Sequence, residues 1–391
     1  MIASKPMFFN EIVGLRIYLA LWVAVGHGLQ LAGFLDKSNA ILKVLLNGHS
    51  AVMVFIIISG FVITNLLLVK RETYPRYIVR RFFRLYPAYV LCLTAGYFIW
   101  DDWAWIVRNV PWSSPSWARY SAQIVEIRGE MDRNFWPHFL LHGIMMHGAV
   151  PDAVLNRAAM TFVPAAWSIS LEWQFYLVAP LVIAAFRKPW QTLLVVAIAL
   201  GAFAAYELGL LGHYDIQSSL AASTPWFIVG IVSRLGFERL SRLSLSPLLV
   251  GVPIAMAVML VIPEPLPIAL WAVFFSYMLW QRNAPVTGAI FRFFTTTRPF
   301  QLLGEASYSL YLVHRPVQIA LASAIMTGFA VTQWSMVVIQ FAAILIAIPL
   351  SILMYFTVER AGIKLGQRLA QRLPGPSTPA EPSPPPVPLA S

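Results

Sequence analysis

Cysteine and charge are what this sequence has least of. Cys92 is the only cysteine in 391 residues, which excludes an intramolecular disulfide and a metal site built on cysteines. Charged residues make up only 12% of the chain, roughly half of their share in a soluble globular domain. Because 59% of the residues are hydrophobic, a soluble enzyme, a disordered chain and a small disulfide-bonded scaffold are all excluded.

Long apolar runs fill most of the chain instead. A transmembrane helix needs about 20 mostly apolar residues, whereas a membrane β-barrel needs short alternating segments. The sequence therefore predicts an all-α fold, a polytopic transmembrane helical bundle of about ten spanning helices. We expect these helices at 12–34, 50–69, 84–100, 163–186, 190–211, 220–235, 245–262, 265–280, 302–327 and 334–358.

Positive charge is concentrated in alternate connections between these runs. The net charge is +11, and basic residues follow every second predicted helix. The first such connection contains Lys70, Arg71, Arg76, Arg80, Arg81 and Arg84, and the next contains Arg187 and Lys188. By the positive-inside rule, both termini are expected in the cytoplasm. The expected partner of this charge is the lipid bilayer, not a nucleic acid.

Two segments differ from the predicted spans. Segment 136–150 is short, so we expect it to be a re-entrant or interfacial segment on the outer face. It contains His138, His142 and His147, to which the sequence assigns no chemistry. Residues 363–391 are first basic and then proline-rich, and we expect a disordered cytoplasmic tail there. The transmembrane domain is then expected over residues 1–362.

Four ionisable residues fall inside predicted spans. They are Arg16, His27, Glu172 and His314. A charged side chain in the hydrocarbon core is costly, so each of them is a candidate functional residue. Arg16 and His27 share one helix face about 16 Å apart, and His27, Glu172 and His314 are expected at a similar depth in a core about 30 Å thick. The alternative is that each one only holds neighbouring helices together.

These residue types fit proton transfer. A histidine can move a proton near neutral pH, and a buried carboxylate can orient it or raise its basicity. The same side chains have the ligand types for a metal ion, but no spacing such as H-E-x-x-H supports a metal site, and we expect none.

Two further motifs have alternative interpretations. Arg81 and Arg84 are three residues apart and share a helix face, which suits binding of phosphate groups. The positive-inside rule alone could also explain them. Ser59, Gly60 and Phe61 lie in the second predicted span, where the small pair permits close helix packing.

Taken in chain order, these motifs resemble acyltransferase family 3, a family of integral membrane O-acyltransferases. The motifs are LRIYLALWVAVGH with Arg16 and His27, FIIISGFVITNLL with Ser59 to Phe61, RRFFRLYP with Arg81 and Arg84, WSISLEWQFYLVAP with Glu172, and LGEASYSLYLVHRPV with His314. Glu359 ends the last predicted span, as a glutamate does in many members. The resemblance covers about residues 10–362.

The resemblance implies an activity and a place. An acyl group, most often acetyl, would move from cytoplasmic acetyl-CoA or another acyl-CoA to a sugar hydroxyl of a cell-surface acceptor such as an exopolysaccharide, a lipopolysaccharide or a glycolipid. A family of this kind is expected in the bacterial inner membrane, as a multi-pass protein with both termini cytoplasmic.

The resemblance also implies roles for the residues. Arg81 and Arg84 would bind the phosphates of coenzyme A, and Arg16 would stabilise the donor or the developing oxyanion. His27 would be the general base or a transient acyl carrier, oriented by Glu172, with His314 as a second polar wall.

Two other function classes fit some of the same features. A transporter or flippase for a lipid-linked sugar also needs charge in the membrane, but it favours internal repeats, which we do not find. A scaffold protein that offers its proline-rich tail to a partner would not need the polar residues inside the membrane.

Overall fold

The fold of the described residues is entirely helical, as predicted. The computed structural model describes residues 8–36, 39–70, 72–186, 188–262 and 264–375, and these contain no strand. Arg71, Arg187 and the proline-rich stretch 376–391 lie outside the described residues.

Ten helices overlap the ten expected spans. They are α1 (Asn10–Leu31), α3 (Gly48–Val69), α4 (Tyr74–Asn109), α7 (Trp167–Ala185), α8 (Pro189–Glu207), α9 (Leu220–Leu240), α10 (Pro247–Val261), α11 (Leu266–Trp280), α14 (Ser307–Met326) and α15 (Gln333–Met354). Within the described residues, seven helical stretches are long and apolar enough to cross a membrane, and these contain all of the ten except α10, α11 and α14. Crossing by those three helices stays a prediction.

The remaining elements are short or lie outside the expected spans. They are the helices α2 (Ala40–Leu45), α5 (Pro115–Arg133), α6 (Phe135–Gly143), α12 (Pro285–Thr296), α13 (Arg298–Glu305) and α16 (Arg360–Arg372). Single turns are η1 (His147–Ala149), η2 (Ala158–Met160), η3 (Pro164–Ala166), η4 (Gln281–Asn283) and the π-helical η5 (Tyr355–Glu359).

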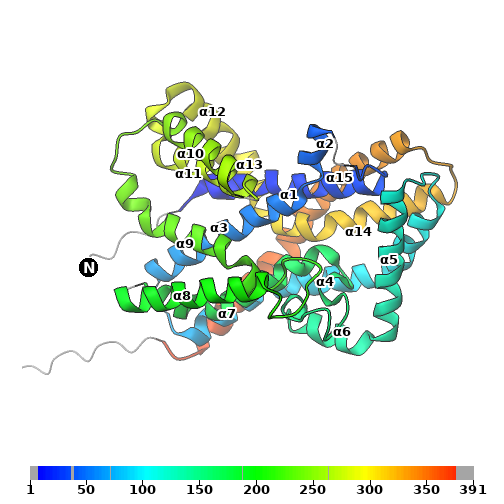
Figure 1. Cartoon of the computed structure of the whole chain (residues 1–391), viewed down its shortest axis with the longest axis horizontal. Helices are drawn as coiled ribbons and strands as arrows, with labels where there is room; N and C mark the ends of the chain where they lie inside the picture. The colour runs from blue at the N-terminus through cyan, green and yellow to red at the C-terminus, as the bar shows by residue number, and fades with distance from the viewer. Residues whose placement is uncertain (1–7, 37–38, 71, 187, 263, 376–391) are drawn as a thin grey trace, which may run out of the picture.

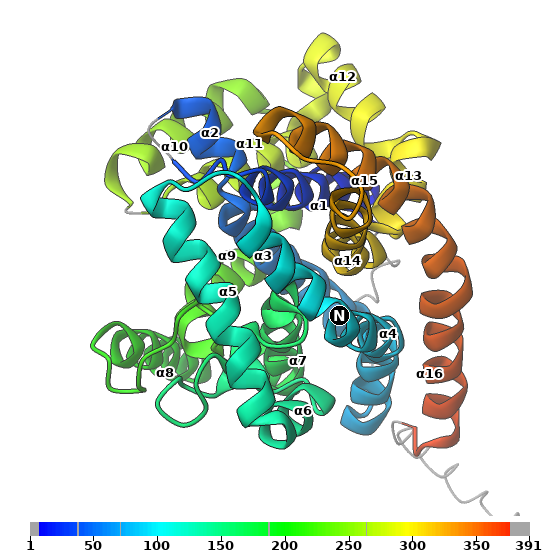
Figure 2. The same ribbon diagram turned by 90° about the vertical axis from the view of Figure 1, so that its right-hand side faces the viewer.

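The bundle has two distinct ends. Helices α1, α3 and α14 run along its long axis, and the start of α1 and the end of α16 lie at one end of it (Figure 1). We call this the basic end, because Lys70 and the arginines at the start of α4 lie there. At the opposite end, here called the far end, α5 crosses the bundle, as the view toward this end shows (Figure 2). The segment expected to be re-entrant or interfacial, 136–150, forms α6 and η1 beside α5.

Helix α4 is much longer than expected. The sequence predicted a helix over 84–100, preceded by a basic connection, but α4 has 36 residues. Its length of about 54 Å exceeds an apolar core about 30 Å thick. The arginines from Arg76 to Arg84 therefore lie on the helix and not in a loop. Hydropathy marks only the apolar part of a helix, whereas between Arg76 and Asn109 only Pro87 and Gly96 oppose helix formation.

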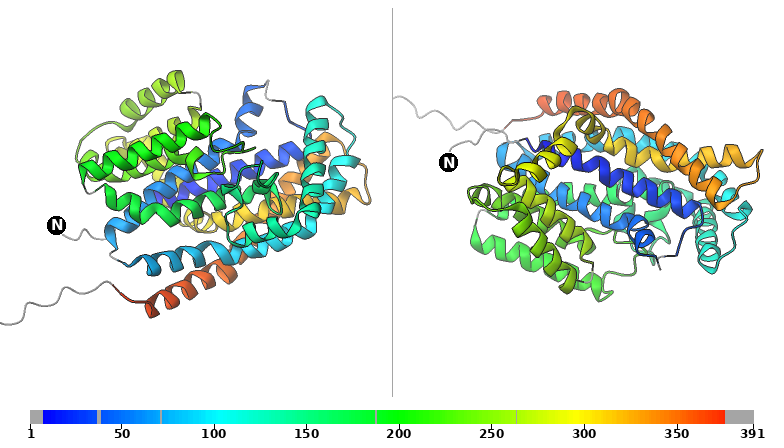
Figure 3. Two further views of the ribbon diagram at one scale, coloured as in Figure 1. Left: turned by 60° about the horizontal axis from the view of Figure 1, so that its bottom comes forward. Right: turned by 90° about the horizontal axis from the view of Figure 1, so that it is seen from above.

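Helical structure also continues further toward the C-terminus than expected. The basic part of the expected tail forms α16, which runs beside α4 (Figure 3). Gly362 and Gly366 allow this contact, because a Cβ atom on either would lie 2.6 Å from a side-chain atom of Pro87 or Phe83. Helical packing therefore continues to Arg372, whereas the end of the transmembrane domain at residue 362 stays a prediction.

A close contact between α3 and α9 fixes the centre of the bundle. A Cβ atom on Gly60 would lie 2.5 Å from the Phe227 carbonyl oxygen, and one on Gly230 would overlap the Ile57 carbonyl oxygen. The adjacent Phe61 is fully buried and packs edge-to-face on Phe9, with ring centroids 4.8 Å apart. Both glycines are therefore needed for the backbones to approach.

We expect Gly230→Ala to destabilise the protein. The added methyl group must push α9 away from α3, and such overpacking costs about 1–3 kcal/mol. The midpoint of thermal unfolding in detergent measures this loss. Gly201→Ala in α8 is the matched control, because a Cβ atom there meets nothing within 4 Å, and it should leave the midpoint unchanged or raise it. Equal midpoints for the two variants would contradict the close packing.

Candidate active site

A cavity of about 420 Å³ lies between α1, α3, α4, α7 and α14. Its polar lining consists of Arg16, Ser59, Asn65, Lys70, Arg81, Arg84, Ser168, Glu172, Tyr176, Ser307, Tyr308 and Tyr311. Lys70 and Arg81 lie toward the basic end, because α3 ends and α4 begins there. Phe55, Ser168 and Tyr311 lie toward the far end, as the directions of α3, α7 and α14 require.

The cavity carries more positive than negative charge. Among the described residues, Arg16, Lys70 and Arg81 line it without an ion pair to any carboxylate. The guanidinium of Arg81 lies 5.8 Å above the ring centroid of Tyr176. Glu172 is the carboxylate in the described lining. A cleft of this charge in a medium of low dielectric constant favours an anionic ligand.

Glu172 links two walls of the cavity. Its carboxylate accepts hydrogen bonds from the Ser59 hydroxyl at 3.3 Å and from the Tyr176 hydroxyl. The sequence placed Glu172 at the depth of His27, so that it could orient the imidazole, but the structure gives it these two partners instead. Position along a helix indicates depth only if all helices start at one level with equal tilt, which a sequence does not show.

The two histidines expected at mid-depth do come together. The rings of His27 and His314 are stacked, with centroids 5.4 Å apart and planes inclined by 21°. Nδ1 of His27 bonds to the Gln30 side-chain oxygen at 3.1 Å, and Nδ1 of His314 bonds to the Leu310 carbonyl at 3.3 Å. These acceptors assign the proton of a neutral ring to Nδ1 in both cases. Each Nε2 is then left with a free lone pair.

Arg315 holds the histidine pair in place, and the sequence analysis missed it. Its side chain is 4% exposed, and it donates hydrogen bonds to the His27 carbonyl oxygen at 3.0 Å and to the Tyr120 hydroxyl at 2.6 Å. Its guanidinium also lies 4.3 Å from the ring centroid of Trp103. Arg315 thus joins α14 to α1, α4 and α5. An arginine inside a predicted span was the signal that could have revealed it.

Arg84 differs from Arg81 because it has a buried partner. It forms an ion pair with Glu359, whose other carboxylate oxygen accepts a hydrogen bond from the Ser309 hydroxyl at 2.8 Å. Glu359 is 1% exposed and ends the π-helical turn η5. Of the predicted phosphate-binding pair, Arg81 is therefore free to bind a ligand, whereas Arg84 is already held.

Tyr311 separates the cavity from the histidine pair. It lines the cavity, and its ring centroid is 6.0 Å from that of His314, one turn further along α14. The predicted site residues thus form two groups. Arg16, Ser59, Arg81, Arg84 and Glu172 line the cavity, and His27 and His314 lie beyond Tyr311. Gly60 and Phe61 pack behind the wall.

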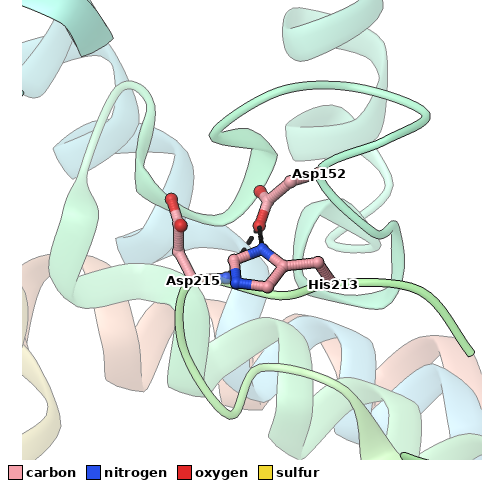
Figure 4. A group of neighbouring side chains, drawn as sticks. All are labelled: Asp152, His213 and Asp215. Carbon is pink, nitrogen blue, oxygen red and sulfur yellow. Dashed lines mark hydrogen bonds and ion pairs between the residues drawn. The ribbon is translucent and has the colours of Figure 1, made fainter. Parts of the chain in front are cut away.

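A possible metal-ligand group lies elsewhere, on connections outside the spans. Ligand atoms of Asp152, His213 and Asp215 all lie within 4.8 Å of one another in the described structure (Figure 4). Asp152 contacts His213 Nδ1 at 3.3 Å and accepts a hydrogen bond from the Asp215 backbone N–H at 2.7 Å, and Asp215 pairs with Arg157. Burial and the neighbouring Asp215 raise the pKa of Asp152. These existing bonds explain the group as a link between two connections.

The comparison with known families decides between the function classes. The family model described as an acyltransferase domain, that of acyltransferase family 3, matches residues 9–356. The chain belongs to acyltransferase family 3. With its apolar helices, this family 3 protein is a membrane acyltransferase. No curated protein and no solved structure matches the chain.

The histidines of segment 136–150 lie outside the spans of this acyltransferase, and they are buried. His142 and His147 are stacked with ring centroids 3.8 Å apart, and both are fully buried. Burial lowers the pKa of His147 to about 3, and burial together with His147 lowers the pKa of His142 well below its usual range. Both rings are therefore neutral in the folded protein at ordinary pH.

We expect the midpoint of thermal unfolding to fall as the pH is lowered from about 6.5 to 5. In this range the histidines of the unfolded chain bind protons, whereas the buried rings stay neutral. Each ring therefore lowers the free energy of unfolding by about 1.4 kcal/mol per pH unit. Replacing His147 with Gln should reduce this slope. His213→Gln, at a ring that is 77% exposed, should leave it unchanged. An unaltered slope in His147→Gln would contradict the assignment.

We expect Glu359→Gln to destabilise the protein strongly. It removes the counter-ion of Arg84, and breaking a buried ion pair from one side costs about 3–5 kcal/mol. Glu305→Gln is the control, because Glu305 is an exposed carboxylate bonded to the Tyr355 hydroxyl at 2.8 Å. Thermal unfolding measures both, and a loss no larger than that of the control would show that Arg84 does not depend on Glu359.

Proposed function

We propose that this family 3 acyltransferase moves an acetyl or other acyl group from acyl-CoA to a sugar hydroxyl of a cell-surface polysaccharide or glycolipid. The observation that carries the proposal is the placement of one cavity. Unpaired cations line it toward the basic end, and it stops one side chain short of two stacked histidines. We place the basic end in the cytoplasm of a bacterium, by the positive-inside rule, and the far end outside the inner membrane.

The donor binds from the basic end. Coenzyme A carries several phosphate negative charges, and Arg81 and Lys70 are the cations nearest the basic end of the cavity without a carboxylate partner. Arginine binds phosphate oxygens through two parallel N–H groups. Arg16, which also lines the cavity, holds the arm of the donor. Arg84 shapes the wall through Glu359 and contributes its charge at a fixed position.

We place the transfer at the far end of the cavity, at the edge of the Tyr311 ring and next to the histidine pair. The acceptor hydroxyl oxygen attacks the carbonyl carbon of the thioester, the C–S bond breaks, and coenzyme A leaves as the thiol. Nε2 of His27, free of a proton in the neutral ring, accepts the hydroxyl proton. Arg16 lies about 16 Å from His27 along α1, so Arg315, which bonds to the His27 carbonyl oxygen, is the nearer cation for the developing negative charge.

The experiment is a thiol-release assay. Purified protein in detergent is incubated with acetyl-CoA, and free thiol is followed with and without a panel of glycans and glycolipids. Faster thiol release with one acceptor class, and acetyl on that acceptor by mass spectrometry, supports the proposal. If calorimetry detects no binding of acyl-CoA and no thiol is released with any acceptor, the proposed donor is wrong. The transporter alternative predicts this second result.

We expect His27→Gln to abolish transfer while the protein stays folded. Glutamine keeps much of the size and some hydrogen bonding of histidine, but it cannot accept a proton at neutral pH. If His27 only joined helices, Gln would keep most of the activity, since such bonds average under about 1 kcal/mol. The assay above measures the activity, and thermal unfolding checks the fold.

Two further variants, one of them a control, separate donor binding from the transfer step. Arg81→Ala should raise the KM for acetyl-CoA about ten- to a hundredfold, as expected for the loss of a charged hydrogen bond of roughly 1.5–3 kcal/mol, and should change kcat little. His213→Gln, at the exposed ring, should leave both constants unchanged. A folded His27→Gln protein with near wild-type activity would remove His27 from the mechanism and leave His314 as the candidate base.

A further inference from the structure

The far end of the cavity is closed by aromatic side chains. Among the residues that line it, Phe55 on α3, Ser168 on α7 and Tyr311 on α14 lie nearest to the far end. The rings of Phe55 and Tyr311 meet edge to face, with centroids 6.1 Å apart. The histidine rings are absent from the cavity lining and begin directly behind Tyr311.

Tyr311 is held firmly in this position. Its hydroxyl donates a hydrogen bond to the Ala165 carbonyl oxygen at 2.8 Å and is 2.9 Å from the Ser168 hydroxyl, which bonds it from the other side. The residue is 6% exposed. Three contacts from α3, η3 and α7 thus fix the ring, so it forms a wall and not a loose side chain.

We propose that Tyr311, together with Phe55, limits the length of the acyl chain, so that the donor is a short-chain acyl-CoA. This inference rests on the proposed function and adds the specificity of its donor site. The phosphates of the donor are anchored at the basic end by Arg81 and Lys70, and the arm between phosphate and thioester has a constant length. The thioester therefore always falls at the same depth, and a longer acyl chain reaches further toward this wall.

Each further methylene group must take space that the wall occupies. Protein interiors are close-packed, so a longer chain needs a side chain to move. The ring of His314 lies behind Tyr311, and its Nε2 is buried without a partner in the described structure. Removing the tyrosine ring therefore opens the cavity toward the histidine pair instead of leaving a closed void.

The test compares acetyl-, butyryl- and hexanoyl-CoA in the thiol-release assay. We expect the wild type to prefer acetyl-CoA by kcat/KM. Tyr311→Ala should shift the ratio of hexanoyl to acetyl activity by about tenfold or more, since one methylene group in a fitted pocket discriminates by about tenfold. Tyr311→Phe keeps the ring and loses only the hydroxyl, and it should keep the wild-type chain-length preference.

Further variants guard against a failure of folding. Phe55→Ala removes the second part of the wall and should shift the same ratio in the same direction. Tyr277→Ala removes a tyrosine buried to a similar degree on α11, away from the cavity, and should leave the ratio unchanged. The activity of the wild type on the three acyl-CoA donors tests the inference by itself, whether or not any variant folds.

The outcomes separate this inference from the proposed function. A wild type that uses hexanoyl-CoA as well as acetyl-CoA would overturn the inference and leave the acyltransferase proposal standing. An unchanged ratio in folded Tyr311→Ala and Phe55→Ala proteins would do the same. A wild type that uses no acyl-CoA of any length would overturn the proposed function, and the inference with it.

Discussion

Uncompensated charge in an apolar core is the constraint on which this structure depends. A lone cation there is costly, and the arginines on the spanning helices fall into two groups. Arg84 has a buried counter-ion in Glu359, and Arg315 has neutral acceptors and an aromatic face. Arg16 and Arg81 have neither a carboxylate nor a carbonyl among the described residues, and both face the cavity. The cations without partners are thus the ones that a ligand can reach.

The same constraint explains the division between cavity and histidine pair. A donor with phosphate groups needs free positive charge, whereas a general base needs a neutral ring with a free lone pair. If the two were side by side, the positive charge of Arg16 would lower the proton affinity of His27. The structure keeps them about 16 Å apart along α1 and puts the ring of Tyr311 between the cavity and His314.

The sequence predicted the helical class, most spans and the candidate residues, because each of these depends on local features. Apolar runs mark membrane depth, and an ionisable residue within such a run is conspicuous wherever it lies. Partners could not be predicted in the same way. The pairing of Glu172 with Ser59 and Tyr176, in place of His27, depends on the relative height of three helices. Arg315 was overlooked beside His314. The expected span for α4 was too short, because its arginines end the apolar run but not the helix.

The contact between Arg84 and Glu359 bears on how far this domain extends. The recognisable family region ends at residue 356, three positions before the carboxylate that neutralises Arg84 and before the glycines that seat α16 on α4. A chain trimmed to the matched region would keep every other residue discussed for the cavity and leave the half-buried Arg84 in its wall without a counter-ion. The packed structure thus extends beyond the region that the family model matches, and the last helix supports α4, which lines the cavity.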